Sequence, residues 1–339
     1  MIGKTNAVSK PGVALSLVVS VTSGATVTAT KGTETVTGTA ASGSCTLNIP
    51  EAGTWSVVAT LSGQTSSTKN VSVVDSYAVA LNFVSSTLND NDWSVISDVS
   101  DEGTGANYWS IGDRKAVALS GTVGSLTFSG TYYAFIIGFN HNSAKEGSNR
   151  IHFQFAKTAL SGGSDICFTD SYYNNTGGGF RMNTTSTNSG GWASSNMRTA
   201  LCGTSLSSYS GTFIGVLPAA LRAALKSVTK YTNNTGNSTA ASAVTATTDY
   251  IFLLAEYEVF GSTSYANSTE ASYQTQYAYY SAGNSKIKYQ HGSTSTAAVL
   301  WLRSPSVSYS TGFVFVGADG TVGSYYAGYS IGFAPGFCV

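Results

Sequence analysis

The chain has 339 residues, of which only 10% are Asp, Glu, Lys or Arg, against about 25% in a typical globular protein. Its 17 basic and 17 acidic residues cancel, so no net field attracts nucleic acid, an anionic membrane or an acidic substrate. The length allows two domains, and the 20 Tyr and 15 Phe favour short strands and irregular loops over long charged helices.

The first block of the chain, up to about Val74, predicts an all-β sandwich. The apolar run Val13 to Val21 is interrupted by Ser residues and leads into more strand-like sequence, so we predict a first strand there rather than a signal peptide. Short Thr/Val-rich runs separated by Gly, Ser and Pro turns follow it. In GTWSVVATL the alternation places Trp55 in the core. The block resembles the immunoglobulin-like or carboxypeptidase-regulatory-like modules of phage structural proteins and bacterial surface proteins, and an immunoglobulin-like sandwich is predicted to span residues 1–83.

From residue 84 the pattern becomes mixed. The segments DWSVIS, YWSIGDRKAVALSG, SLTFSG and YYAFIIGFN, between Trp93 and Phe139, are predicted as strands. Ser194 or Ser195 is a plausible N-cap for a short helix. VLPAALRAALKSVTKYT, residues 216–232, predicts the clearest helix of the chain, with an apolar stripe that leaves three basic residues outside it: Arg222, Lys226 and Lys230.

The last third alternates between strands and loops. DYIFLLAEYEVFG predicts a buried strand, Ile251 to Leu254, that runs into a helical turn begun by Glu256. The final strands are expected in AAVLWLRSP, GFVFVGADGTV and GFAPGFCV. Together these elements predict an α+β domain over residues 84–339.

Several segments carry a resemblance to a known family. WSIGDRKAVALSG, IIGFNHNS, GWASSNMR, LPAALRAALKSV, DYIFLLAEYEVFG, WLRSP, GFVFVGADGTV and a terminal GFCV occur in this order. The set is similar to an uncharacterised family of C-type-lectin-like domains in phage and prophage virion proteins of gut Firmicutes. The resemblance implies a C-type-lectin-like fold and a virion setting, but no established activity. Related variants end with an Arg-Pro pair, whereas this chain has Ala334 before Pro335.

The residues do not favour a metal centre. Amide and carboxylate side chains gather between positions 89 and 102, at a domain junction and without EF-hand spacing, so a solvated turn is favoured over a calcium site: Asn89, Asp90, Asn91, Asp92, Asp98, Asp101 and Glu102. The four cysteines form no CxxC pair. Buried free thiols are favoured, with a Cys167–Cys202 disulfide as the alternative.

Enzymatic chemistry is not expected either. Cys338 lies between Phe337 and Val339, which suits a buried thiol rather than the reactive thiolate of an oxidase. The three histidines, His141, His152 and His291, are scattered and accompany no catalytic motif, so structural roles are favoured. We therefore predict no enzymatic activity and no cofactor.

Arg303, between Trp301 and Pro305 in an apolar strand, is the unusual charge of the C-terminal region. A buried guanidinium must find carbonyls or a carboxylate, and Asp249, Glu256 or Glu258 are the candidates. We favour a structural role over direct contact with a ligand. The predicted structural core comprises Trp55, Trp109, Trp192, Trp301, Arg303 and Pro305.

The segment beyond Arg303 is rich in Tyr, Ser and Gly, the composition of adaptable binding surfaces. Tyr rings also stack on sugar faces while their hydroxyls form hydrogen bonds. The alternative is that Tyr fills half-buried strand positions, since Tyr277, Tyr279 and Tyr280 show that Tyr is common elsewhere. The candidate ligand-binding residues are Tyr309, Tyr325, Tyr326, Tyr329, Ser308 and Ser324.

These observations predict a non-enzymatic protein of the virion surface. The first domain would be a spacer or attachment module, and the second would bind a host cell-surface glycan or protein, displayed as a homo-oligomer. One alternative is a head or tail decoration protein that packs against other virion subunits, and another is a secreted bacterial surface adhesin. An oxidase-like enzyme is the least favoured hypothesis. Neither nucleic-acid binding nor membrane insertion is expected.

Overall fold

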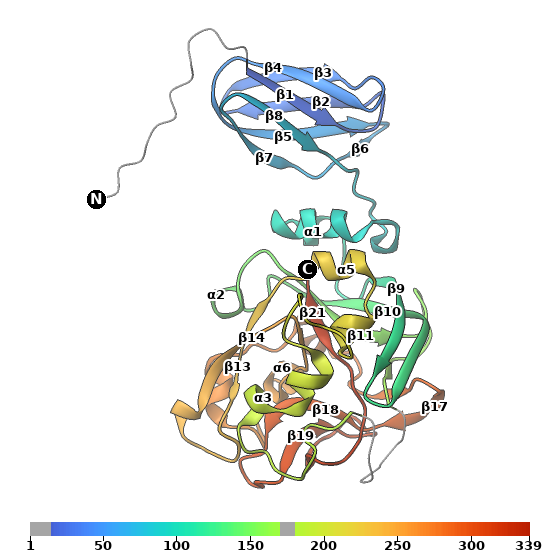
Figure 1. The fold of residues 1–339 in the computed structure, drawn as a ribbon, viewed down its shortest axis with the longest axis vertical. Coiled ribbons are helices and arrows are strands. Elements are labelled where there is room, and N and C mark those ends of the chain that lie inside the picture. The colour runs from blue at the N-terminus through green and yellow to red at the C-terminus, as the bar shows by residue number, and fades with distance from the viewer. Residues whose placement is uncertain (1–14, 170–179) are drawn as a thin grey trace, which may run out of the picture. The chain divides into compact units, whose positions relative to one another are not determined.

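The computed structural model describes residues 15–169 and 180–339. The chain is a mixed α+β protein, built mostly of strands in several sheets with a few short helices (Figure 1). It divides into two compact units, residues 1–86 and 87–339. No helix in the described ranges is long and apolar enough to cross a membrane.

The first unit contains only strands among its described residues. Two sheets, with orders β4-β1-β8 and β3-β2-β5-β6, enclose its core, and β7 pairs with β5. Of the predicted first strand, Val13 and Ala14 lie outside the described residues, and the following residues form β1 as far as Ser20. The strands are β1 (Leu15–Ser20), β2 (Thr26–Lys31), β3 (Glu34–Thr39), β4 (Ser44–Ile49), β5 (Gly53–Leu61), β6 (Gln64–Thr65), β7 (Lys69–Val73) and β8 (Ser76–Ala80).

Strand β5 forms the centre of this core. Its alternate residues Trp55, Val57 and Ala59 are fully buried, as the period of two in the sequence predicts. The Trp55 indole N–H donates a hydrogen bond to the Glu51 carbonyl at 3.2 Å, so the one polar atom of this side chain is also satisfied.

A five-stranded sheet organises the second unit. Its order is β15-β21-β11-β10-β9, so the last strand of the chain lies between two strands that precede it by many residues. Phe337 pairs with Phe153 on one side and with Ile251 on the other. The strands are β9 (Arg114–Val123), β10 (Leu126–Phe139), β11 (Ile151–Lys157), β15 (Ile251–Phe252) and β21 (Gly336–Cys338).

The second unit contains three smaller sheets as well: β12-β16-β17, β13-β14 and β18-β19-β20. Their strands are β12 (Ile166–Cys167), β13 (Val228–Asn233), β14 (Val244–Asp249), β16 (Lys288–Gln290), β17 (Ser293–Ala298), β18 (Leu300–Pro305), β19 (Gly312–Val316) and β20 (Val322–Tyr326). The short α-helices are α2 (Ser143–Glu146), α3 (Gly191–Ser194), α4 (Phe213–Val216), α5 (Ala219–Ala224), α6 (Glu256–Phe260) and α7 (Ala278–Ser281).

The prediction of a strand in DWSVIS is wrong, because this segment begins helix α1 (Trp93–Asp101). Its buried residues include Trp93, Ile96 and Val99, which are spaced three apart and therefore share a helical face. In a segment of only six residues, the alternation of polar and apolar side chains resembles the period of a strand more than that of a helix. Part of the predicted strand YWSIGD is also a turn, since β9 begins at Arg114.

The predicted helix over residues 216–232 is likewise much shorter. Helix α5 ends at Ala224, Leu225 has extended backbone angles, and Val228 begins strand β13, which pairs with β14 in a hairpin. The β-branched residues that follow Ser227 favour a strand once a partner strand is present. Lys230, expected outside the apolar stripe of a helix, instead lies on β13 and is fully buried.

Replacing Trp55 with Ala should destabilise the first unit by about 3–5 kcal/mol, because the substitution leaves a large cavity in its core. Hydrogen exchange of the full chain provides the measurement: protection should fall in β2 and β5 and remain unchanged in β18. Tyr77→Ala is the matched control, since Tyr77 is 44% exposed on β8. Unchanged protection in β5 would contradict the assignment of Trp55 to the core.

Candidate functional site

The three-stranded sheet β18-β19-β20 carries the Tyr-rich segment. Pro305 pairs with Phe313, and Phe313 pairs with Tyr325, so the strands bring the beginning, middle and end of this segment together. Trp301 anchors the sheet, because its buried indole N–H donates to the Phe180 carbonyl at 3.0 Å.

A single buried side chain fixes the loop between β18 and β19. The Asn188 side-chain amide donates hydrogen bonds to three carbonyls of this loop, at 2.9, 3.0 and 2.9 Å: Ser306, Tyr309 and Gly312. Its backbone N–H donates to the Ser310 carbonyl at 2.8 Å. The loop that carries Tyr309 is therefore held at four points through its backbone.

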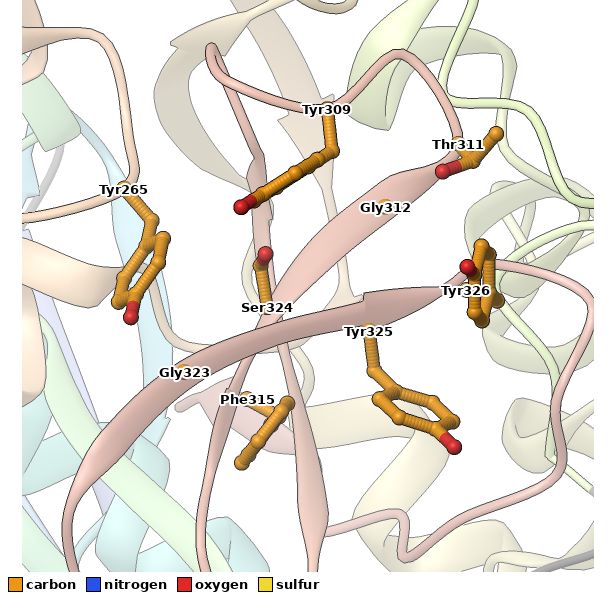
Figure 2. A pocket seen from close by; sticks show the side chains of 9 residues that line it. All are labelled: Tyr265, Tyr309, Thr311, Gly312, Phe315, Gly323, Ser324, Tyr325 and Tyr326. Carbon is orange, nitrogen blue, oxygen red and sulfur yellow. The ribbon is translucent and has the colours of Figure 1, made fainter.

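A groove of about 440 Å³ lies on this sheet and its loops (Figure 2). Five aromatic rings line it, together with two hydroxyl side chains and two glycines: Tyr265, Tyr309, Thr311, Gly312, Phe315, Gly323, Ser324, Tyr325 and Tyr326. None of these residues carries a formal charge at neutral pH. We call this feature the tyrosine groove.

Gly323 on β20 leaves room for a ring of the neighbouring strand. A Cβ atom there would lie 2.5 Å from the Phe315 ring, the residue directly opposite on β19. The missing side chain lets the Phe315 ring lie over the β20 backbone, where it forms part of the groove wall (Figure 2).

The rings of the groove differ in how far they are exposed. The Tyr309 side chain is 58% exposed and that of Tyr326 is 47% exposed, which places both among the most exposed large hydrophobic residues described. Tyr325 is half-buried and packs edge to face against Tyr329, with ring centroids 4.9 Å apart. Tyr309 and Tyr326 are thus the rings most available to a partner.

The structure brings part of the predicted candidate set to this groove. Four of the six candidate residues line the groove: Tyr309, Tyr325, Tyr326 and Ser324. Tyr329 contacts the rings of Tyr325 and Tyr326 without lining the groove, and Ser308 is exposed on the neighbouring loop. Sequence reasoning missed Tyr265 and Phe315, which come from a distant loop and from an otherwise apolar strand.

Glu256 holds the loop that brings Tyr265 into the groove. Its carboxylate accepts hydrogen bonds from the backbone N–H groups of Ser264, Tyr265 and Ala266, the last at 2.7 Å. The Tyr265 carbonyl in turn accepts from the backbone N–H of Val307 at 2.8 Å. One buried carboxylate on α6 therefore fixes this wall of the groove against the β18–β19 loop.

Arg303, on β18, is fully buried and forms a bidentate ion pair with Glu258 of α6. Its guanidinium donates to the two Glu258 carboxylate oxygens at 2.5 and 2.8 Å. It also donates at 2.8 Å to the Leu253 carbonyl and to the Thr232 hydroxyl. Of the three partners expected for this guanidinium, the structure selects Glu258. Asp249 pairs instead with Arg198, at 2.6 Å.

The Arg303–Glu258 pair extends into a buried network that the sequence does not reveal. Lys230 Nζ lies 3.1 Å from Glu258 Oε1 and 2.6 Å from Glu146 Oε2, and it donates to the Tyr277 hydroxyl at 2.8 Å. The residues of this network come from five separate elements or loops. Two carboxyl groups thus face two cations in this network, and burial raises the pKa of Glu146 to about 7.

His141 and His152 border this network as neutral rings. The His141 ring stacks on Tyr277 with centroids 3.7 Å apart, and His152 Nδ1 lies 3.1 Å from the Tyr277 hydroxyl. Burial, followed by the nearby Lys230 charge, lowers the pKa of His141 to about 3. The same causes lower the pKa of His152 well below its usual range. Neither ring is charged near neutral pH.

His141, Glu146 and Glu258 are the one cluster of metal-binding side chains among the residues that the structure describes. The Lys230 ammonium already binds both carboxylates, so a divalent ion would have to displace it. The acidic residues between positions 90 and 102 form no such cluster. Near them, Lys115 Nζ donates to the Asn89 and Asn91 carbonyls, and Asp101 pairs with Lys226 at 2.8 Å.

The four cysteines are buried and free, as predicted. Burial raises the pKa of both Cys167 and Cys338 to about 12, so neither forms a thiolate near neutral pH. Cys338 Sγ lies 3.3 Å from His152 Nδ1, inside the core rather than at a surface. Both thiols therefore lie in the core and are protonated near neutral pH.

The remaining predicted core residues are buried. The Trp192 indole N–H donates to Asp249 Oδ2 at 3.1 Å, which supports the carboxylate that pairs with Arg198. Trp109 is 3% exposed, and Pro305 is also buried. Ser195, a predicted N-cap, accepts a hydrogen bond from the backbone N–H of Arg198 at the start of the next helical segment, at 3.1 Å.

Comparison with known proteins identifies a family but no characterised relative. Residues 168–339, half of the chain, match the family model described as Domain of unknown function (DUF6273). This range contains the tyrosine groove, Arg303 and Glu258. No curated protein matches the chain, and no solved structure matches it.

Replacing Arg303 with Met should destabilise the second unit by about 3–5 kcal/mol, because it leaves the Glu258 carboxylate buried with only part of its compensation. Adding Glu258→Gln should recover part of that loss, as a double-mutant cycle in denaturant would measure. The exposed Lys145→Met is the control, and its effect should stay within about 0.5 kcal/mol. Equal effects of Arg303→Met and Lys145→Met would contradict the role of the ion pair.

His141 should make the protein sensitive to acid. Its folded pKa of about 3 lies below the unfolded value of about 6.5, so its contribution to stability is lost as the pH falls from 6.5 toward 3. The loss amounts to about 2 kcal/mol at pH 5. His141→Phe keeps a ring against Tyr277 and removes the titration. The difference in unfolding free energy between the native chain and this variant should therefore shift by that amount between pH 7 and pH 5, and a constant difference would contradict it.

Proposed function

The chain belongs to the DUF6273 family, and we propose that it is a non-enzymatic protein of the phage virion surface that binds a receptor on the host cell through the tyrosine groove. The observation that carries the proposal is a concave surface lined by five aromatic rings and held by a buried hydrogen-bonded frame. Rigid aromatic side chains on an anchored loop are typical of binding surfaces.

The exposure of Tyr309 and Tyr326 supports this proposal. Two large rings of the groove lining remain accessible, although the fold buries Tyr277, Tyr279 and Tyr280 of the same chain. Tyr therefore does not simply fill half-buried strand positions throughout this protein. Exposed aromatic side chains gathered at one concave site indicate contact with a partner.

The groove chemistry favours binding over catalysis. Its lining offers hydroxyl groups and rings, while the histidines and cysteines with altered pKa values lie in the core of the unit. A general base or nucleophile must reach the substrate, and these groups lack that access. We therefore propose that the protein recognises its ligand without transforming it.

We also propose a specific fold for each of the two units. The second unit is proposed to be C-type-lectin-like, and the first an immunoglobulin-like sandwich that acts as a spacer or virion attachment module. The two sheets enclosing one core in residues 15–86 support the latter assignment. Display as a homo-oligomer would strengthen weak individual sites through multivalency.

A decoration protein is the second candidate, because exposed Tyr rings also suit a contact with another virion subunit. A bacterial surface adhesin would use the same groove in a different setting. The receptor-binding protein and the decoration protein differ in what the groove contacts, so variants that remove its exposed rings separate these two.

Particles that carry Tyr309→Ala and Tyr326→Ala should assemble normally and adsorb to host cells at least about tenfold less well, since a loss of about 1.4 kcal/mol in binding suffices for that change. Tyr77→Ala, which removes an exposed ring from the first unit, is the matched control. Intact particles with unchanged adsorption would refute receptor binding at this groove. A failure of assembly would favour the decoration protein.

A further inference from the structure

The ligand class follows from the chemistry of the tyrosine groove, and this step rests on the proposed receptor-binding function. We infer that the groove binds an uncharged sugar chain and that it does so without a metal ion.

Charge is the first argument. Among the described residues that line the groove there is no Lys, Arg, His, Asp or Glu. An anionic polymer, such as a phosphate-linked or sialylated glycan, would lose its hydration without gaining a cationic partner. A calcium-dependent mode is disfavoured for the same reason, because this lining supplies no carboxylate to hold the ion.

The polar groups that are present match sugar hydroxyls. Each Tyr, Ser and Thr hydroxyl can donate and accept a hydrogen bond, as the hydroxyls of a neutral sugar also do. Figure 2 shows the hydroxyl groups of Tyr309 and Ser324 directed toward the same part of the groove, between the Tyr265 and Tyr326 rings. A neutral ligand rich in hydroxyls can therefore satisfy these groups without a charged partner.

The aromatic rings supply the apolar part of the recognition. Pyranose rings present C–H groups on a face, and such a face packs on an aromatic side chain while the ring edge remains available for hydrogen bonds. Tyr309 and Tyr326, the most exposed rings of the groove, are placed to provide this contact. Their flat surfaces cost little conformational entropy when a ligand binds.

The dimensions favour a small ligand segment over a folded protein. The volume of about 440 Å³ falls within the range of about 300–1,000 Å³ that is usual for small-molecule sites. A stable protein interface needs about 800 Å² on each partner. Of the exposed large hydrophobic residues that the structure describes, only Tyr309 and Tyr326 belong to the groove. The site therefore suits a short stretch of glycan.

The inference can be tested with the purified full-length chain and host-cell envelopes. Periodate treatment, which cleaves vicinal diols in sugars, should reduce binding at least tenfold, while protease treatment should leave it unchanged. Binding should persist in EDTA and change less than twofold between 50 and 500 mM NaCl, because no ion pair or metal contributes. Tyr309→Ala should weaken binding at least tenfold, and Tyr309→Phe, which keeps the ring, should weaken it less.

The possible failures are distinguishable. Binding that survives periodate but not protease would overturn the glycan inference and leave receptor recognition at the groove intact. Binding that EDTA or high salt abolishes would also overturn it, in favour of a metal-dependent or anionic ligand. If Tyr309→Ala and Tyr326→Ala bind untreated envelopes as well as Tyr77→Ala and the native chain do, the proposed function itself fails.

Discussion

The bidentate contact between Arg303 and Glu258 is the interaction on which the order of the second unit depends. It joins β18 to α6 in the core, where an unpaired charge of either sign would be strongly unfavourable. The guanidinium also bonds to the Thr232 hydroxyl on β13 and to the Leu253 carbonyl just beyond β15. Because its donor geometry is a rigid fork, Arg303 fixes orientation as well as distance between these segments.

Helix α6 transmits this order to the surface. Glu258 faces the core network, while Glu256, two residues earlier, binds the backbone of the loop that carries Tyr265. The helix has only five residues, so its own hydrogen bonds provide little stability. The contacts of Glu258 with Arg303 and of Glu256 with the Tyr265 loop set the position of the helix. The wall of the groove that Tyr265 forms is therefore placed by the same helix. The paired charges of the core thus hold in place a groove whose lining carries no charge.

Local sequence patterns predicted those features that local physics determines. The alternating residues around Trp55 form the predicted buried strand. The apolar segment before Glu256 is followed by a helical turn that begins at Glu256, as predicted. The helix over residues 216–232 failed as a prediction because pairing between β13 and β14 overrides the helical preference of its second half. The same error placed Lys230 on a surface when it lies in the core.

The buried network could not be predicted from spacing. Glu146, Lys230, Glu258, Tyr277 and Arg303 are separated by up to 84 residues between neighbours, and no motif marks them as a group. The signal available in the sequence was the low overall charge. Lys, Arg and Glu residues that stand within apolar segments of such a protein are expected to pair with one another when they are buried. The groove was more accessible to prediction, because most of its rings belong to one continuous segment.

The way in which Asn188 holds the β18–β19 loop has an evolutionary consequence. Its amide contacts only carbonyl oxygens, and every residue type supplies one. The path of the loop is therefore largely independent of which side chains it displays. Substitutions at Tyr309 and its exposed neighbours can change the chemistry of this surface while the chain keeps its fold, so sequence variation here costs little stability.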